Sequence, residues 1–220
     1  MGRAVAIFDW DGVVVDSSAA HERAWARLAA EEGLPLAPGS FLRGFGKRNE
    51  VIIPQIHGWA SDPTEVRRLS LAKEAHYREL AEDGLIRLLP GAAELLRALA
   101  EAGIPRVVGT STHRANLDLA FRKFGLAGWF DGAVTSEDVV RGKPDPEVFL
   151  KACALAGGDP ARSVVFEDTL PGIAAAKAGA FRAVGLCTTN PREVMAGSGA
   201  DALVADLSEV TVALALPGGP

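Results

Sequence analysis

Short apolar runs alternate with helical patterns along most of this 220-residue chain, and this alternation constrains the fold more than any other feature. The runs are typical of strands buried on both faces, and they cover residues 4–8, 106–110, 132–136, 163–167 and 182–186. Apolar residues spaced three and four apart indicate helices at 91–103, 114–125, 145–157 and 170–180. The alternation predicts an α/β fold, a doubly wound parallel sheet with helices on both faces.

The segment between Ser17 and Ile86 interrupts this alternation. It contains no convincing strand, only helical patterns at 21–33 and 65–84 joined by "PLAPGSFLRGFGKRNE". The alternation resumes near Pro90. We therefore expect a helical insertion after the first strand. The expected division is an α/β core domain formed by residues 1–16 and 87–220, and a helical domain at 17–86.

Charge and cysteine content limit the partners that we expect. The formal net charge of −5 argues against a nucleic-acid backbone or an anionic membrane as partner. Cys153 and Cys187 lie far apart, without the spacing of a zinc site or a disulfide framework. No apolar stretch approaches the length of a membrane span. We expect a cytoplasmic protein, and a monomer or weak dimer.

Polar side chains follow the predicted strands. Ligands of an open parallel sheet bind beyond the carboxyl ends of its strands. The residues found there are two acids, two hydroxyls, a loop lysine and two further acids: Asp9, Asp11, Thr110, Ser111, Lys143, Glu167 and Asp168. Acids attract a cation, whereas hydroxyls and a lysine attract an anion. Together they predict a divalent metal beside a phosphate.

Each residue has a plainer explanation when it is taken alone. An Asp-Gly pair is a common turn, and Glu167 and Asp168 could cap the helix that follows. An EF-hand loop is excluded because its glycine would lie two positions later and Ala20 stands where its glutamate belongs. The conjunction of all the groups favours a phosphoryl site.

Four motifs in order resemble those of the haloacid dehalogenase superfamily of phosphotransferases. They are "DWDGVVVDS" from Asp9, the strand-end Thr110-Ser111, "GKPDPEVF" around Lys143 and "VVFEDTLPGIAAAKAGA" around Asp168. They match the branch that includes β-phosphoglucomutase and phosphoglycolate-type phosphatases. The motifs extend from residue 9 to about 180, so the resemblance covers most of the chain. It implies a Rossmann-like core with an inserted helical cap.

The resemblance also implies roles for the core residues. Asp9 is the expected nucleophile, which becomes an aspartyl-phosphate. Asp11 is the expected acid and base, since residues i and i+2 of extended backbone point to the same side. Thr110 and the backbone N–H of Ser111 are expected to hold phosphoryl oxygens. Lys143 is expected to neutralise charge between the nucleophile and the phosphate.

A magnesium ion is the implied cofactor. Its expected ligands are Asp9, the backbone carbonyl of Asp11, and Asp168, which form the oxygen set that a hard cation prefers. Glu167 is expected to be an adjacent or water-mediated ligand. Gly12 is expected to permit the tight turn that delivers Asp11.

The resemblance also implies roles for residues of the cap. His21 matches a cap histidine beside the acid/base aspartate of β-phosphoglucomutase. Lys73 and either Lys47 or Arg48 fall where that enzyme has cations that meet the second phosphate or the sugar. The alternative for each is a solvated charge or a half-buried packing residue. Two further histidines are interpreted as ordinary surface or packing residues, namely His57 and His76.

The function predicted from these motifs is Mg²⁺-dependent hydrolysis of a small phosphate monoester through an aspartyl-phosphate, with a sugar phosphate as one candidate substrate. The alternative is a β-phosphoglucomutase-like mutase that returns the phosphoryl group to another hydroxyl. A receiver-like signalling domain is disfavoured because it carries its phosphoacceptor after a later strand and lacks a cap. An inactive binding protein is disfavoured because no motif residue is missing.

Overall fold

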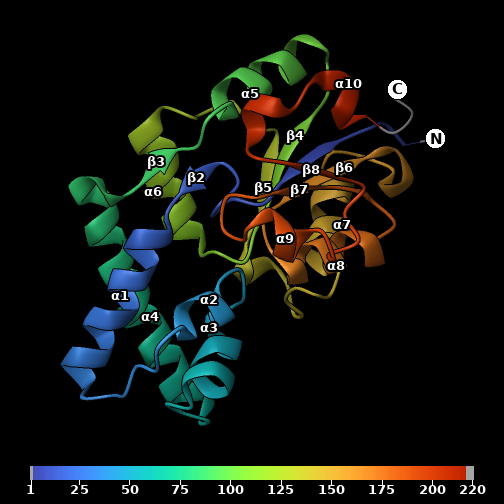
Figure 1. The fold of residues 1–220 in the computed structure, drawn as a ribbon. Coiled ribbons are helices and arrows are strands. Elements are labelled where there is room, and N and C mark those ends of the chain that lie inside the picture. Colours follow the sequence, from blue (N-terminus) through green and yellow to red (C-terminus); the bar gives the residue numbers. More distant parts are fainter. Residues whose placement is uncertain (1, 217–220) are drawn as a thin grey trace.

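Six parallel strands form the centre of the molecule in the computed structural model, which describes residues 2–216 (Figure 1). Their order across the sheet is β5-β4-β1-β6-β7-β8. The strands are β1 (Ala6–Phe8), β4 (Arg106–Gly109), β5 (Gly132–Val134), β6 (Val164–Glu167), β7 (Arg182–Leu186) and β8 (Ala202–Val204). The predicted α/β class with a doubly wound parallel sheet is confirmed. Because β1 lies between β4 and β6, the strand order reverses beside it, and ligands of such sheets bind there.

The central strands bury side chains on both faces of the sheet. Phe8 pairs in register with Val108 and Phe166, and all three pack on one face. Ile7, one residue earlier, belongs to the apolar cluster on the other face. Alternate residues of a strand point to opposite faces, so a continuous apolar run is what two helix layers require.

Each face of the sheet is covered by helices. The Phe8 face carries α5 (Ala92–Glu101), α6 (Arg114–Phe124) and α10 (Val212–Ala215). The Ile7 face carries α7 (Glu147–Leu155), α8 (Leu170–Ala178) and α9 (Arg192–Met195). Short helical turns are η3 (Ser136–Asp138), η4 (Pro160–Arg162) and η5 (Leu207–Glu209). None of the helices within residues 2–216 combines the length and the apolar character that crossing a membrane requires.

A small two-stranded antiparallel sheet lies where the chain leaves and rejoins the α/β core. It consists of β2 (Val15–Asp16) and β3 (Arg87–Leu88), and the Arg87 guanidinium lies 2.7 Å from the Asp16 carboxylate. The sequence analysis did not predict these two strands, because two residues are too short to show a period, and it did not predict β8.

The segment between β2 and β3 is helical, as expected. It contains α1 (Ser18–Glu32), α2 (Ser40–Gly44), α3 (Asn49–Val51), η1 (Ile52–His57), α4 (Pro63–Leu80) and η2 (Ala81–Leu85). Figure 1 shows α1 and α4 side by side, away from the sheet. These helices have an apolar cluster of their own, which includes Trp25, Leu28, Ile53 and Leu69. A separate core is what an inserted helical unit needs.

Two helix boundaries differ from the predicted ones for local reasons. The helix predicted at 21–33 begins three residues earlier, at Ser18, and ends at Gly33 in the left-handed conformation. The helix predicted at 65–84 begins at Pro63, where the Asp62 carboxylate accepts two backbone N–H bonds. Its regular part ends at Leu80, and Gly84 has a positive φ that no regular helix allows.

Candidate active site

Asp9 lies directly after β1, at the point where the strand order reverses. Its backbone N–H donates to the carbonyl of Phe166, so the residue continues the sheet by one position, and its side chain is buried. Gly12 follows with φ +81°, and a Cβ at that position would collide with the Asp168 carboxylate. Glycine therefore allows the turn that brings Asp11 back toward the pocket, as predicted.

Lys143 connects two carboxylates that follow different strands. Its ammonium lies 2.9 Å from Asp9 Oδ1 and 2.6 Å from Glu167 Oε1, and all three side chains are buried. Burial opposes the charge on Lys143, but the two carboxylates outweigh it and hold the pKa of Lys143 above its ordinary value. The second oxygen of Glu167 accepts hydrogen bonds from the backbone N–H and the hydroxyl of Thr169. Both Glu167 oxygens are thus engaged.

Asp168 differs from Glu167 in its hydrogen bonding. Both of its oxygens are buried and accept no hydrogen bond from any described residue. Burial, and then the charges of Glu167 and Asp9, raise the pKa of Asp168 above its ordinary value, and burial likewise raises the pKa of Asp9 against the pull of Lys143. One oxygen from each of the three acids lies within 4.8 Å of the others. Lys143 balances the charge of at most one of the three carboxylates, and their remaining negative charge favours a bound cation.

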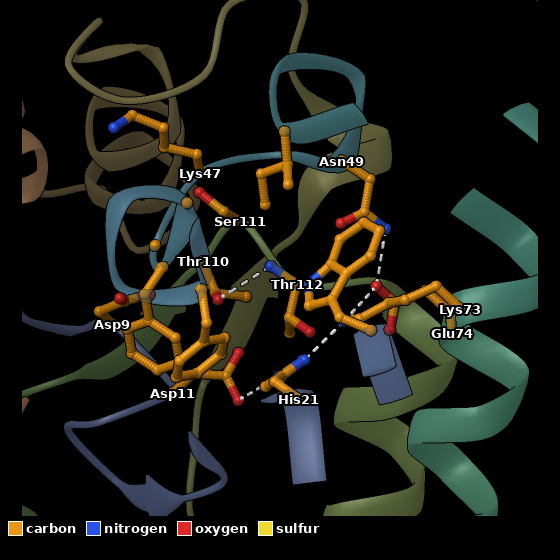
Figure 2. Close-up of a pocket in the computed structure, with 16 residues that line it drawn as sticks. Asp9, Asp11, His21, Lys47, Asn49, Lys73, Glu74, Thr110, Ser111 and Thr112 are labelled. Atoms are coloured by element: carbon orange, nitrogen blue, oxygen red, sulfur yellow. Dashed lines mark hydrogen bonds and ion pairs between the residues drawn. The ribbon is translucent and has the colours of Figure 1, made fainter. Parts of the chain in front are cut away.

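Thr110, Ser111 and Thr112 follow β4 and line one pocket with Asp9 and Asp11. The Thr110 side chain is buried, and its hydroxyl accepts a hydrogen bond of 3.1 Å from the Thr112 backbone N–H. Figure 2 shows this bond, with Asp9 and Asp11 beneath it. Hydroxyls and backbone N–H groups at a strand end can hold phosphoryl oxygens.

Asp11 is held by two residues at the start of α1. The Ser17 hydroxyl donates to Asp11 Oδ1 at 2.6 Å, and His21 Nε2 lies 3.3 Å from the same oxygen. Burial raises the proton affinity of this carboxyl, but His21, Ser17 and then Lys73 outweigh it and lower the pKa of Asp11. Asp11 is therefore ionised in the ligand-free protein.

His21 connects Asp11 to α4. Its Nδ1 lies 2.6 Å from the Lys73 ammonium, and its ring stacks on Tyr77 with centroids 4.0 Å apart. Lys73 also lies 2.9 Å from the Glu74 carboxylate. The structure thus brings His21 and Lys73 to the pocket, with His21 beside Asp11 and Lys73 between His21 and Glu74.

Lys47 and Arg48 have other partners. Lys47 contributes to the pocket lining, but its ammonium donates to the Arg43 carbonyl at 2.9 Å. Figure 2 shows it turned away from Asp11 and His21. The Arg48 guanidinium donates to the Val139 and Val140 carbonyls in the loop that leads to Lys143.

The helical insertion closes the pocket with apolar side chains. Trp25, Phe41, Phe45 and Ile52 line it opposite Asp9.

Several lining residues were not found by the sequence analysis. They include Trp25, Asn49 and Glu74. Asn49 and Glu74 are buried polar residues that bond each other across 25 positions, and no local pattern indicates such a pair. His57 stacks on Trp59 and His76 contacts Glu31, as expected for packing and surface residues.

Comparisons with known proteins place these features in a family. The sequence profile of the haloacid dehalogenase-like hydrolases matches residues 4–179. The validoxylamine A 7'-phosphate phosphatase of Streptomyces hygroscopicus subsp. limoneus is 36% identical over 94% of this chain and 95% of that protein. The chloroplastic 5-amino-6-(5-phospho-D-ribitylamino)uracil phosphatase of Arabidopsis thaliana is 36% identical over 84% of this chain, which spans 50% of that protein's length.

A mutase and a solved structure are similar as well. The β-phosphoglucomutase of Bacillus subtilis is 30% identical over 94% of this chain and 92% of that protein. A haloacid dehalogenase hydrolase of family IA, variant 3, from Entamoeba histolytica superposes with a TM-score of 0.87 at 26% identity, covering 96% of both chains.

Proposed function

Because this chain belongs to the haloacid dehalogenase-like hydrolases and is a phosphoric monoester hydrolase, we propose that it hydrolyses a small phosphate monoester through an aspartyl-phosphate on Asp9. The observation that carries the proposal is the placement of Asp9. This carboxylate is buried at the end of the central strand, paired with Lys143, and it shares one pocket with Asp11 and Thr110.

The proposed first step transfers the phosphoryl group to the protein. An Asp9 oxygen attacks phosphorus, the bond from phosphorus to the alcohol oxygen breaks, and Asp11 gives that oxygen a proton. Thr110 and the Ser111 N–H hold the phosphoryl oxygens, and Lys143 lies against the nucleophile. Asp11 is ionised before substrate binds, so its proton arrives with the substrate, whose negative charge favours the protonated carboxyl.

The proposed second step releases phosphate. Water attacks phosphorus, Asp11 takes the proton that the water loses, and the bond from phosphorus to Asp9 breaks. Splitting one slow reaction into two easier ones is the advantage of a covalent intermediate. The lowered pKa of Asp11 keeps this carboxyl in the ionised form, which is the form that can accept the proton.

Magnesium is the proposed cofactor. The test of fit is Asp168, whose two buried oxygens lack a hydrogen-bond donor among the described residues, next to Asp9 and Glu167. Asp9 and Asp168, with the Asp11 backbone carbonyl, would be the direct ligands. Glu167 already accepts from Lys143 and Thr169, which favours an adjacent or water-mediated role. When bound, Mg²⁺ would neutralise negative charge on the carboxylates and the phosphoryl oxygens.

We further propose that residues 17–86 act as a cap that opens to admit substrate. Trp25 and Phe45 of this segment line one pocket with Asp9 and Asp11 of the core, so movement of the segment would change the access of an ester to these carboxylates. The paired strands β2 and β3 lie where this segment joins the core residues 1–16 and 87–220. They are the proposed hinge region.

The pocket favours a substrate with a single phosphate. Lys73 lies against Glu74 and His21, and Lys47 donates to a backbone carbonyl. Lys73 is therefore paired with a carboxylate, and Lys47 is turned away from Asp11 and His21, so neither lysine of the described lining is directed at a second phosphate in this arrangement. The phosphatase relatives are named for 5-amino-6-(5-phospho-D-ribitylamino)uracil and validoxylamine A 7'-phosphate, which supports a sugar-phosphate-like substrate.

The second candidate function is the mutase. It is favoured by the similarity to the Bacillus subtilis β-phosphoglucomutase and by His21 and Lys73 beside Asp11. The experiment that tests the phosphatase is phosphate release from a panel of sugar, polyol and aryl phosphates, with and without Mg²⁺. Release from no ester of the panel would contradict it.

A further inference from the structure

Glu74 is a buried carboxylate that the proposed reaction does not use. Its side chain lies in α4, and both oxygens are engaged: Oε1 accepts from Lys73 at 2.9 Å and from Asn49 at 2.7 Å, and Oε2 accepts from Asn116 at 2.6 Å. Glu74, Asn49 and Asn116 are all buried. Three hydrogen-bond donors hold the position and orientation of this buried carboxylate.

Asn116 supplies the contact from the α/β core. It lies in α6, which packs on the sheet, whereas Glu74 belongs to the helical cap. Its amide nitrogen donates to Glu74 and, at 3.3 Å, to the hydroxyl of the pocket residue Thr112. Its amide oxygen accepts from Arg78, one turn further along α4. One amide thus contacts α4 twice and the phosphate side of the pocket once.

A continuous chain of contacts leads from Glu74 to Asp11. The Lys73 ammonium lies between the Glu74 carboxylate at 2.9 Å and His21 Nδ1 at 2.6 Å, and His21 Nε2 lies 3.3 Å from Asp11. Figure 2 shows the contacts from Asn49 to Glu74, and from Lys73 through His21 to Asp11.

The direction of these hydrogen bonds follows from the groups. An ammonium has only donors, so His21 Nδ1 accepts from Lys73 and the ring proton is on Nε2, facing Asp11. Removal of the Glu74 charge would leave Lys73 buried beside two aromatic rings without a carboxylate partner. The ammonium would then move toward the nearest negative charge, and His21 would lose its fixed orientation.

We propose that Glu74 is a positioning residue for Asp11, acting through Lys73 and His21, and that Asn116 makes this position depend on closure of the cap. The inference rests on the proposed function, in which Asp11 protonates the leaving oxygen. It adds that Glu74 of the cap must contact Asn116 of α6 before Asp11 is correctly placed.

The test compares two esters of nearly equal size. Phenyl phosphate has a basic leaving group that needs a proton, whereas the leaving group of 4-nitrophenyl phosphate does not. The quantity measured is kcat/KM, which covers the steps up to loss of the alcohol. Glu74→Gln is expected to lower it at least about tenfold for phenyl phosphate, since a placed acid contributes roughly 10²-fold or more. For 4-nitrophenyl phosphate the change is expected to be less than about threefold.

Lys123→Ala is the matched control. Lys123 also lies on α6, and it donates to the Glu82 carbonyl across the same pair of segments, outside the contacts that reach Asp11. It should leave the ratio of the two kcat/KM values unchanged. Equal losses on both esters in Glu74→Gln would overturn the inference and leave Glu74 a packing residue. Phosphate release by the wild type from no ester at all would instead overturn the proposed function.

The double variant Glu74→Gln/Asn116→Asp distinguishes an effect on the placement of Asp11 from an effect on the stability of the fold. It exchanges the amide and the carboxylate, so the contact between α4 and α6 is kept and the new Asp faces Arg78. Thermal stability should recover relative to Glu74→Gln, while the ratio of the two kcat/KM values should stay altered because Lys73 still lacks its carboxylate. Recovery of the ratio together with the stability would show that Glu74 acts only in packing, and would contradict the proposal.

Discussion

The Lys143 ammonium lies 2.9 Å from the Asp9 carboxylate, and neither side chain has appreciable contact with solvent. A lysine in this position holds the carboxylate in place and offsets part of the charge that a phosphate dianion would otherwise meet. The pair also explains how a buried acid after β1 can be tolerated before any substrate binds. Its consequences are open to direct measurement.

Asp9→Asn should abolish phosphate release while the protein remains folded. An amide cannot form the phospho-enzyme, and loss of a nucleophile costs at least roughly 10³-fold in kcat. Because burial raises the pKa of Asp9, a neutral side chain of the same shape should be accepted with little change in thermal unfolding. Steady-state assays and circular dichroism test both parts. Residual turnover above a few per cent of wild type would exclude Asp9 as the nucleophile.

Removal of divalent cations should stop turnover and lower the melting temperature slightly. Asp9, Glu167 and Asp168 face one another in the protein interior, and a ligand that binds only the folded state stabilises it. Exhaustive treatment with EDTA followed by graded addition of MgCl₂ provides the measurement. In Asp168→Asn, which loses a proposed direct ligand, far more Mg²⁺ should be needed. Full activity of the stripped protein would mean that the acids serve another purpose.

The sequence was sufficient to predict which core residues lie together at the strand ends. The alternation of strands and helices predicts that all strand ends meet at one edge of the sheet, and the topology brings Asp9, Thr110 and Asp168 together there because β4 and β6 flank β1. Charge and residue type then indicate a phosphate beside a cation. The resemblance to one superfamily adds the order of the steps.

The cap side of the site could not be predicted in the same way. The contact between Glu74 and Asn116 joins two helices 42 positions apart, and no local period indicates it. The orientation of Lys47 toward the Arg43 carbonyl is set by a side-chain conformation rather than by residue type. Strands β2 and β3 were missed because two residues show no alternation.

Glu74 should give the protein a stability that depends on pH. Burial opposes its charge, but Lys73 foremost, and then His21, outweigh it and hold the pKa of Glu74 below its ordinary value of 4.5. A depressed pKa contributes stability above pH 4.5, and this contribution is lost as the pH falls, because the unfolded chain takes up the proton first. Glu74→Gln should therefore be less stable than wild type by roughly 3 kcal/mol near neutral pH, and the difference should shrink in acid.

Urea unfolding at a series of pH values between 3 and 8, on the order of one unit apart, measures this difference. Glu79→Gln is the matched control, because Glu79 is exposed on the same helix and pairs with Arg27 at the surface. It should change the free energy of unfolding by less than about 1 kcal/mol at any pH. A deficit in Glu74→Gln that stays constant down to acid pH would show that the charge of Glu74 is not what stabilises the fold.

The last prediction separates hydrolysis from phosphoryl return. Both outcomes pass through phospho-Asp9, so the difference lies in whether water or a second sugar hydroxyl reaches it. A mutase must hold a far phosphate while the sugar turns over, and a cation with free donors is the usual means. In this pocket Lys73 is matched by Glu74, and Lys47 is turned to a backbone carbonyl.

We therefore expect β-glucose 1-phosphate, Mg²⁺ and the protein to give free phosphate or no product, and no glucose 6-phosphate. Phosphorus NMR of the mixture, primed with a little glucose 1,6-bisphosphate, distinguishes the species by chemical shift. Lys47→Ala serves as an internal check: if Lys47 does not hold a phosphate, its removal should leave the product unchanged. Steady accumulation of glucose 6-phosphate without free phosphate would establish the mutase instead, and would require Lys47 or Lys73 to turn into the pocket when the sugar is bound.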